Sequence, residues 1–73
     1  MENEDIETIN SLERLRDVLN QWSVWDLTPD GALTMQSIWG DMFYFKIDMS
    51  KRELFIKAVL AYEQDKDMEW RAI

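Results

Sequence analysis

Apolar residues in the first third of the chain recur at steps of three and four. They are Ile6, Ile9, Leu12, Leu15, Leu19 and Trp22. This spacing places them along one face of a helix. Acidic residues crowd the start of the segment, where the positive end of a helix dipole stabilises them. The pattern therefore predicts a helix over about residues 4–21.

The middle of the chain changes from a helical to an alternating pattern, which is typical of strands. The strands are predicted over about residues 23–28, 32–38 and 42–48. Residues 29–31, Pro-Asp-Gly, form the first turn, because proline presets the first position and glycine can take the left-handed conformation that closes a three-residue loop. A second three-residue loop is expected at 39–41.

Loops of this length decide which side chains share a face, because a one-residue slip moves every side chain to the opposite face. Leu27 should lie opposite Leu33, Trp25 opposite Met35, and Met35 opposite Phe45. One face then collects seven apolar side chains: Trp25, Leu27, Leu33, Met35, Phe43, Phe45 and Ile47. The other face carries a smaller apolar patch, made of Val24, Ile38, Met42 and Tyr44 beside Trp39.

A second helix is predicted over about residues 51–66. Ser50 and Glu53 have the spacing of a capping box, and Met49 and Leu54 around it are spaced for a hydrophobic staple. The inward stripe consists of Leu54, Phe55, Ala58, Val59 and Tyr62. The further apolar residues Ile56 and Leu60 widen this stripe beyond one face, which suggests a contact besides the sheet, within the chain or with a second subunit. The tail, residues 67–73, is apolar at Met68, Trp70 and Ile73 and is expected to fold back as a short helical turn.

The predicted architecture is one small α+β domain over residues 1–73. It consists of a helix, a three-stranded antiparallel meander and a helix, with both helices on the Trp25/Phe45 face. No apolar run approaches the roughly 20 residues that span a bilayer, and the N-terminus lacks the basic start and apolar stretch of a signal peptide. We therefore expect a cytoplasmic protein, in the host cytoplasm if the chain is phage-encoded.

The ionisable residues are unbalanced, with 15 acids, 8 bases and no histidine, and there is no cysteine. The chain thus lacks the usual proton shuttle at neutral pH, the commonest nucleophile and the commonest zinc ligands. We therefore expect that the protein is not an enzyme and binds no metal or cofactor. The acids of residues 65–69 lack the glycine and the distant glutamate of a calcium loop. A net charge of −7 favours a basic partner surface and disfavours nucleic acid or an anionic membrane.

Two groups of residues are candidates for binding a partner protein. Met42 and Tyr44 on the open sheet face would anchor it, with Asp26 and Asp41 as flanking charges, since aromatic and methionine side chains ringed by charge are typical of binding hot spots. A second, acidic contact would be made by Glu63, Asp65, Asp67 and Glu69. The alternative for the open face is that the tail covers it with Trp70 and Ile73.

The order of elements on so small, acidic and cysteine-free a chain resembles that of small acidic phage anti-defence proteins, above all anti-CRISPR inhibitors of Cas9-type nucleases. The resemblance rests on the acidic first helix, the hairpin at 28–31 and the closing helix that starts at Ser50. It implies an inhibitor that occupies the basic groove of a nuclease, with carboxylates in place of DNA phosphates.

We therefore expect a small protein that binds a larger, basic, nucleic-acid-handling partner and blocks or modulates it, without contacting nucleic acid or membrane itself. The alternative is a homodimeric structural or oligomerisation module with the last helix at its interface. A symmetric dimer would bury Ile56 and Leu60 and relieve the marginal stability expected of a small domain.

Overall fold

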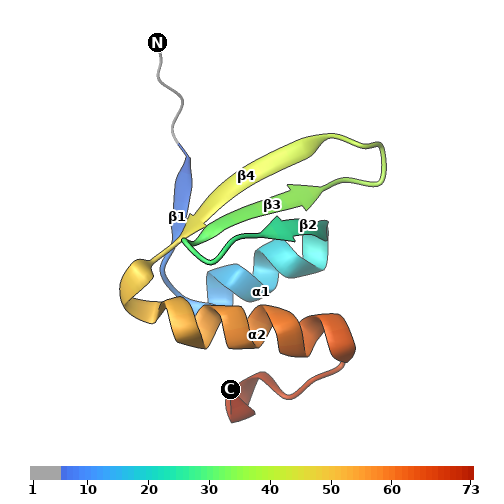
Figure 1. The fold of residues 1–73 in the computed structure, drawn as a ribbon. Helices are drawn as coiled ribbons and strands as arrows, with labels where there is room; N and C mark the ends of the chain where they lie inside the picture. Colours follow the sequence, from blue (N-terminus) through green and yellow to red (C-terminus); the bar gives the residue numbers. More distant parts are fainter. Residues whose placement is uncertain (1–5) are drawn as a thin grey trace.

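The computed structural model describes residues 6–73, except for the side chain of Ala72, as a four-stranded sheet with two helices on one side (Figure 1). The elements in chain order are β1 (Glu7–Ile9), α1 (Leu12–Gln21), β2 (Ser23–Leu27), β3 (Ala32–Gln36), β4 (Met42–Ile47), the 3₁₀ turn η1 (Met49–Lys51), α2 (Arg52–Gln64) and the 3₁₀ turn η2 (Trp70–Ala72). The strand order is β1-β4-β3-β2, with β1 parallel to β4 and the other pairs antiparallel. The predicted α+β class and the order helix, meander, helix are confirmed, with β1 as an additional strand. Among the described residues, neither helix has the length and apolar character needed to cross a membrane.

The first helix is shorter than predicted, because residues 7–9 form β1 on the edge of the sheet. β1 pairs Glu7 with Phe45 and Ile9 with Ile47. Helix α1 then begins after Ser11, whose hydroxyl oxygen accepts a hydrogen bond of 3.1 Å from the backbone N–H of Arg14. The predicted helix over 4–21 is therefore wrong for residues 6–11, and its first two residues lie outside the described part of the chain.

The first hairpin forms as predicted. The backbone N–H of Thr28 donates to the carbonyl of Ala32 (3.0 Å), the N–H of Gly31 donates to the carbonyl of Thr28 (3.1 Å), and Leu27 pairs with Leu33. The hydroxyl of Thr28 also donates to the Asp30 carboxylate within the turn. Gly31 has a φ of 92°, the positive value that the prediction required.

The second hairpin has a five-residue loop, residues 37–41, in place of the predicted three. Met35 pairs with Phe43 and Leu33 with Phe45, so β4 is shifted by two residues from the predicted register. Because side chains alternate with a period of two, this shift returns each one to its predicted face. The predicted pairing of Met35 with Phe45 is therefore wrong, but the buried face of β3 and β4 is as predicted.

Strand β2 contains an irregularity that the sequence did not predict. Regular pairing breaks between Val24, which pairs with Met35, and Asp26, which pairs with Thr34. The intervening Trp25 is the extra residue of this bulge and is exposed, while Val24 packs against the core. The predictions that Trp25 faces the core and that Val24 belongs to the open-face patch are therefore wrong.

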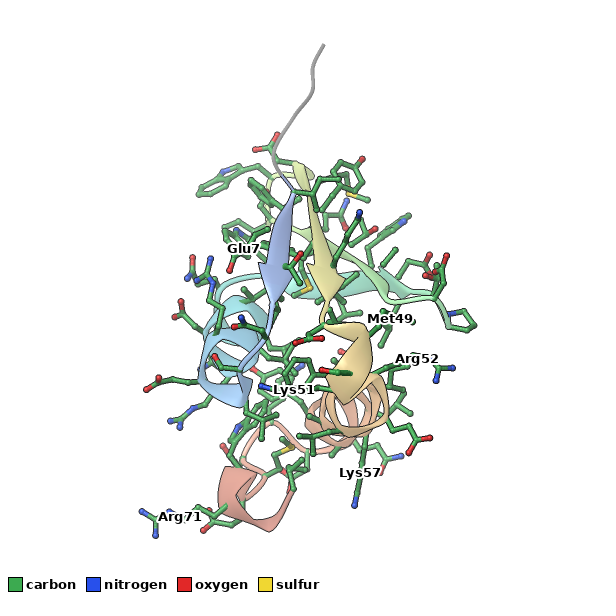
Figure 2. All side chains as sticks on the ribbon, turned by 90° about the vertical axis from the view of Figure 1, so that its left-hand side faces the viewer. Glu7, Met49, Lys51, Arg52, Lys57 and Arg71 are labelled. Atoms are coloured by element: carbon green, nitrogen blue, oxygen red, sulfur yellow. The ribbon has the colours of Figure 1, made fainter. Side chains whose placement is uncertain are left out.

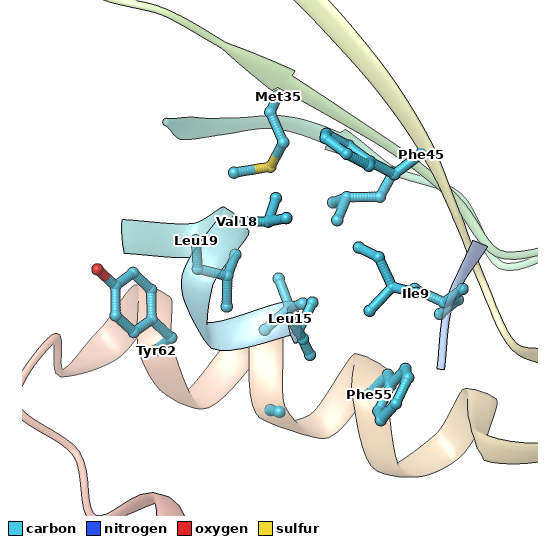
Figure 3. Close-up of a cluster of buried hydrophobic side chains, with 12 residues drawn as sticks. Ile9, Leu15, Val18, Leu19, Met35, Phe45, Phe55 and Tyr62 are labelled. Atoms are coloured by element: carbon cyan, nitrogen blue, oxygen red, sulfur yellow. The ribbon is translucent and has the colours of Figure 1, made fainter. Parts of the chain in front are cut away.

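The core lies between the sheet and the two helices (Figure 3). It consists of Ile9, Leu15, Val18, Leu19, Leu33, Met35, Phe45, Ile47, Phe55, Ala58, Val59 and Tyr62. The one polar end in this cluster, the hydroxyl of Tyr62, donates a hydrogen bond of 2.9 Å to the side-chain oxygen of Asn20. The tail folds back as the predicted helical turn, and the centroids of the Trp70 and Tyr62 rings are 6.0 Å apart.

Helix α2 is preceded by the turn η1, and this moves the cap. The carboxylate of Asp48 accepts hydrogen bonds from the hydroxyl (2.8 Å) and the backbone N–H (3.0 Å) of Ser50. These bonds hold the pKa of Asp48 below its usual value. The predicted capping box of Ser50 and Glu53 is therefore wrong, and Met49 and Leu54 are exposed rather than joined in a buried staple.

Replacing Gly31 or Gly40 by alanine should separate backbone strain from steric contact. Both glycines have a positive φ, 92° and 94°, so an alanine is strained at either position. A Cβ at Gly31 would lie 2.9 Å from Sδ of Met49, which can move, and 3.3 Å from a side-chain carbon of the buried Ile47, which cannot; at Gly40 nothing lies within 4 Å. We expect Gly31→Ala to lower the free energy of unfolding by about 2 kcal/mol and Gly40→Ala by about 1 kcal/mol.

Urea denaturation followed by circular dichroism measures both losses. Equal losses would show that the contacts at Gly31 add nothing to the backbone strain.

Candidate protein-binding surface

The face of the sheet that points away from the helices is open. Asp26 pairs with Thr34, and Thr34 pairs with Tyr44, so these three side chains form one row across β2, β3 and β4. Neighbouring strands lie about 4.8 Å apart, which places Asp26 about 10 Å from Tyr44 across the sheet. Met42 lies two residues before Tyr44 and therefore on the same face. Three of the residues predicted to bind a partner thus share this face.

The tip of the β3–β4 hairpin, residues 37–41, presents two large apolar side chains. Ile38 is 89% exposed and Trp39 is 83% exposed, while Tyr44 further along β4 is 60% exposed. Asp41, the fourth predicted contact, is exposed at the end of this tip, and Met42 beside it is half-buried. Because Ile38 belongs to the loop rather than to β3, its predicted place on the open strand face is wrong.

Ser37 organises the tip. Its hydroxyl oxygen accepts hydrogen bonds from the backbone N–H groups of Trp39 (3.2 Å) and Asp41 (3.1 Å). Its backbone N–H donates to the carbonyl of Asp41 (2.9 Å), and its carbonyl accepts from Gly40 (3.0 Å). Ser37 was not among the predicted contacts, although a serine three positions before a glycine, between two strands, is a known turn signal. The tip is therefore an ordered loop in which the side chains of Ile38 and Trp39 are exposed to solvent.

The tail does not cover the open face. Met68, Trp70 and Ile73 pack against the core cluster, and Trp70 lies beside Tyr62 of α2, on the helix side of the molecule. Tyr44 remains mostly exposed. The alternative in which Trp70 and Ile73 cover the open face is therefore wrong.

The second predicted group lies elsewhere. Its members are exposed at the end of α2 and in the segment that follows: Glu63, Asp65, Asp67 and Glu69. The Asp65 carboxylate accepts a hydrogen bond of 3.0 Å from the backbone N–H of Asp67, and Lys66 lies over the ring of Tyr62 at 4.7 Å. This segment is beyond the helices as seen from the sheet (Figure 1). The structure therefore does not bring the two predicted groups onto one face.

The acidic residue of β1 is engaged within the fold. Arg14 donates to both carboxylate oxygens of Glu7 (2.6 and 2.8 Å) and to Asp17 (2.7 Å), and Glu7 lies on the edge strand in Figure 2. The hydrogen bonds from Arg14 hold the pKa of Glu7 below its usual value. Both side chains are well solvated, so this pair contributes little to stability. It does neutralise part of the negative charge at this end of the molecule.

The carboxylates that could support chemistry are dispersed. Asp30 is tied to Thr28 in the hairpin turn, while Asp26 lies exposed on β2. Within residues 6–73, no cluster of three or more carboxylates is arranged to hold a metal ion. What the described side chains do offer is a rigid hairpin with exposed aromatic groups on an acidic domain.

Comparison with protein-family models, with curated protein sequences and with solved structures found no match to this chain.

Proposed function

We propose that this protein binds a larger protein with a basic surface, through the open sheet face and the tip of the β3–β4 hairpin, and so blocks or modulates it. The observation that carries this proposal is the exposure of Ile38, Trp39 and Tyr44 on one hairpin. Tryptophan and tyrosine are the residues most enriched among those that dominate the energy of protein interfaces. An ordered hairpin that exposes side chains of this kind and size therefore resembles a protein interface in composition.

The order of the tip supports the same proposal. Binding costs conformational entropy when a loop must be fixed, and that cost is lower when the loop is already in its bound conformation. The four hydrogen bonds around Ser37 fix residues 37–41 before any partner arrives. Trp39 can therefore enter a pocket of the partner with little further ordering of the backbone.

Charge indicates what kind of partner this is. The chain carries a net charge of −7, and Asp26 and Asp41 flank the apolar residues of the open face. A basic partner would be attracted to this surface at long range, which raises the rate of association. Enzymes that hold nucleic acid present strongly basic grooves, so they are the class of partner that we propose.

The test begins with differential capture from a bacterial or phage-infected lysate. The immobilised wild-type protein is compared with Trp39→Ala and Tyr44→Ala, and with Met49→Ala as a matched control, because Met49 is an exposed apolar residue outside the hairpin. We expect the partner to be retained by the wild type and the control and to be lost from the two hairpin variants. All four proteins should show the same circular dichroism spectrum.

Kinetics with the purified partner give the size of each effect. Trp39→Ala and Tyr44→Ala should each weaken binding by about 30-fold, or ~2 kcal/mol, mainly through faster dissociation. Reversing the charges of Asp65 and Asp67 should mainly slow association, and raising the salt from about 50 mM to about 500 mM should weaken binding for the same reason. A partner held equally by both hairpin variants would disprove the proposed surface, and a salt-independent affinity would disprove the electrostatic part.

A further inference from the structure

A second exposed apolar feature lies between the edge strand β2 and helix α2. It is a groove of about 490 Å³ whose floor and walls are apolar along most of its length. The residues that matter here are Trp25 and Leu27 from β2, and Arg52, Ile56, Leu60 and Glu63 from α2. Leu60 is 58% exposed and Trp25 is 62% exposed, so the side chains of residues 6–73 that are described leave the groove unfilled. The groove adjoins the open sheet face at Asp26, which lines both, but Tyr44, Met42 and the hairpin tip lie outside it.

The α2 side of the groove has a simple order of side chains. Arg52, Ile56, Leu60 and Glu63 stand four, four and three residues apart, so they form one row along the helix. The row reads base, apolar, apolar, acid, and with a rise of 1.5 Å per residue its ends are about 16 Å apart. When a second α2 helix lies antiparallel to the first, the acid of each row lies opposite the base of the other, and the apolar residues lie opposite each other. It is therefore complementary to an antiparallel copy of itself.

We infer that a second copy of this chain occupies the groove, with the two α2 helices antiparallel about a two-fold axis. Arg52 of each copy then faces Glu63 of the other, and Ile56 of each faces Leu60 of the other. Both pairings are compatible with a single two-fold axis. The midpoint between residues 52 and 63 lies between positions 57 and 58, and the midpoint between residues 56 and 60 is position 58. The axis therefore passes at the level of residue 58. A two-fold interface of this kind uses the same surface on both subunits. The charge order favours a second copy over an unrelated partner.

Strand β2 fits the same axis. The guanidinium of Arg52 donates a hydrogen bond of 2.6 Å to the carbonyl of Pro29, which ties the turn after β2 to the start of α2. The start of β2, at Val24, lines the groove together with Glu63 at the other end of α2. β2 therefore runs antiparallel to α2, and its middle lies beside the middle of the row. Trp25, exposed at that level, would be covered by the second copy.

The dimer leaves Tyr44, Met42 and the hairpin tip free, although Asp26 lines the groove, and its test does not depend on the proposed function. Sedimentation equilibrium of the wild type, up to a chain concentration of about 200 µM, measures it directly, since weak interfaces have micromolar constants. We expect a monomer–dimer equilibrium, with the dissociation constant raised at least tenfold by Leu60→Glu. Tyr44→Ala is the matched control, because Tyr44 is as exposed as Leu60 but lies on the open face, and it should dimerise like the wild type.

A charge exchange tests the antiparallel pairing itself. Glu63→Arg alone places Arg52 against an arginine, and Arg52→Glu alone places Glu63 against a glutamate, so each variant should be monomeric. An equimolar mixture restores both ion pairs and should form the heterodimer. Glu13→Arg and Lys46→Glu, which make the same charge changes at exposed positions outside the groove, should dimerise as the wild type does.

Three results would each overturn the inference. They are a wild type that stays monomeric at about 200 µM, a dimer that Leu60→Glu leaves unchanged, and a mixture of the two folded charge variants that remains monomeric. Arg52→Glu also loses the bond to Pro29, so its folding is checked by circular dichroism. If that variant is unfolded, Glu63→Arg decides, and a dimer that it leaves intact overturns the pairing.

Discussion

Replacing Phe55 by alanine is expected to remove a large part of the stability of the domain. Phe55 is fully buried on α2 and is among the largest side chains in the core (Figure 3). Phenylalanine-to-alanine changes in such positions cost about 3–5 kcal/mol, from the lost apolar burial and the cavity that remains. A domain of 73 residues has a free energy of unfolding of only about 4–11 kcal/mol. Urea denaturation should therefore show a loss of about 3–5 kcal/mol, a large part of this total, and thermal denaturation a clearly lower melting temperature.

The neighbouring Leu54 supplies the control. It is 37% exposed, and the sequence pattern placed it in the same inward stripe as Phe55. Because Leu54 lies outside the core cluster and its removal leaves no enclosed cavity, Leu54→Ala should cost less than about 1 kcal/mol. Similar losses for the two variants would mean that α2 is rotated about its axis relative to the orientation described above.

The faces of β3 and β4 were predictable even though their register was not. The alternation of apolar and polar residues assigns each side chain to a face, and every even shift of register preserves that assignment. The loop contains two residues more than predicted, residues 37 and 38. The hydrogen bonds of Ser37 stabilise this wider turn in place of the strand pairing expected for these two residues. A serine's local bonds contribute nothing to hydrophobic periodicity, and the longer loop was missed for that reason.

Trp25 shows where alternation fails. A bulge adds one residue to a strand, and side chains on the two sides of it are out of phase. In the sequence, Val24 and Trp25 are adjacent apolar residues that interrupt the alternation, but this pair does not show which of the two faces the core. The bulge fills the inward position with Val24, which is smaller, and leaves the indole beside the groove.

The candidate surface was predicted in part for the same reasons. Tyr44, Met42 and Asp26 were correctly placed on the open face, because they depend only on alternation and on the first hairpin. The exposure of Trp39 depends on the bonds of Ser37. Whether the tail covered the open face depended on long-range packing, since Trp70 could reach either side of the molecule. The contact of Trp70 with Tyr62 places the tail on the helix side, and no local sequence pattern predicts this contact.

The largest error of the sequence analysis, the extension of the first helix, leads to the second large prediction. Ile6 and Ile9 continue the helical spacing of α1, so a helix over 4–21 would place both on its buried face. The parallel pairing of β1 with β4 joins residues 38 positions apart and leaves no local signal. Ile9, the last residue of β1, is fully buried between sheet and helices, whereas Ile6, just before β1, is 42% exposed.

Ile9→Ala should therefore lower the free energy of unfolding by about 2–4 kcal/mol, whereas Ile6→Ala should lower it by less than about 1 kcal/mol. Urea denaturation followed by circular dichroism measures both losses under the same conditions. Hydrogen exchange adds a local test, because the backbone N–H of Asp48, which donates to the carbonyl of Ile9 at 2.9 Å, should lose protection in Ile9→Ala. Equal losses at Ile6 and Ile9, with the Asp48 N–H unprotected already in the wild type, would be the result of a continuous helix over 4–21 and would show that β1 does not form.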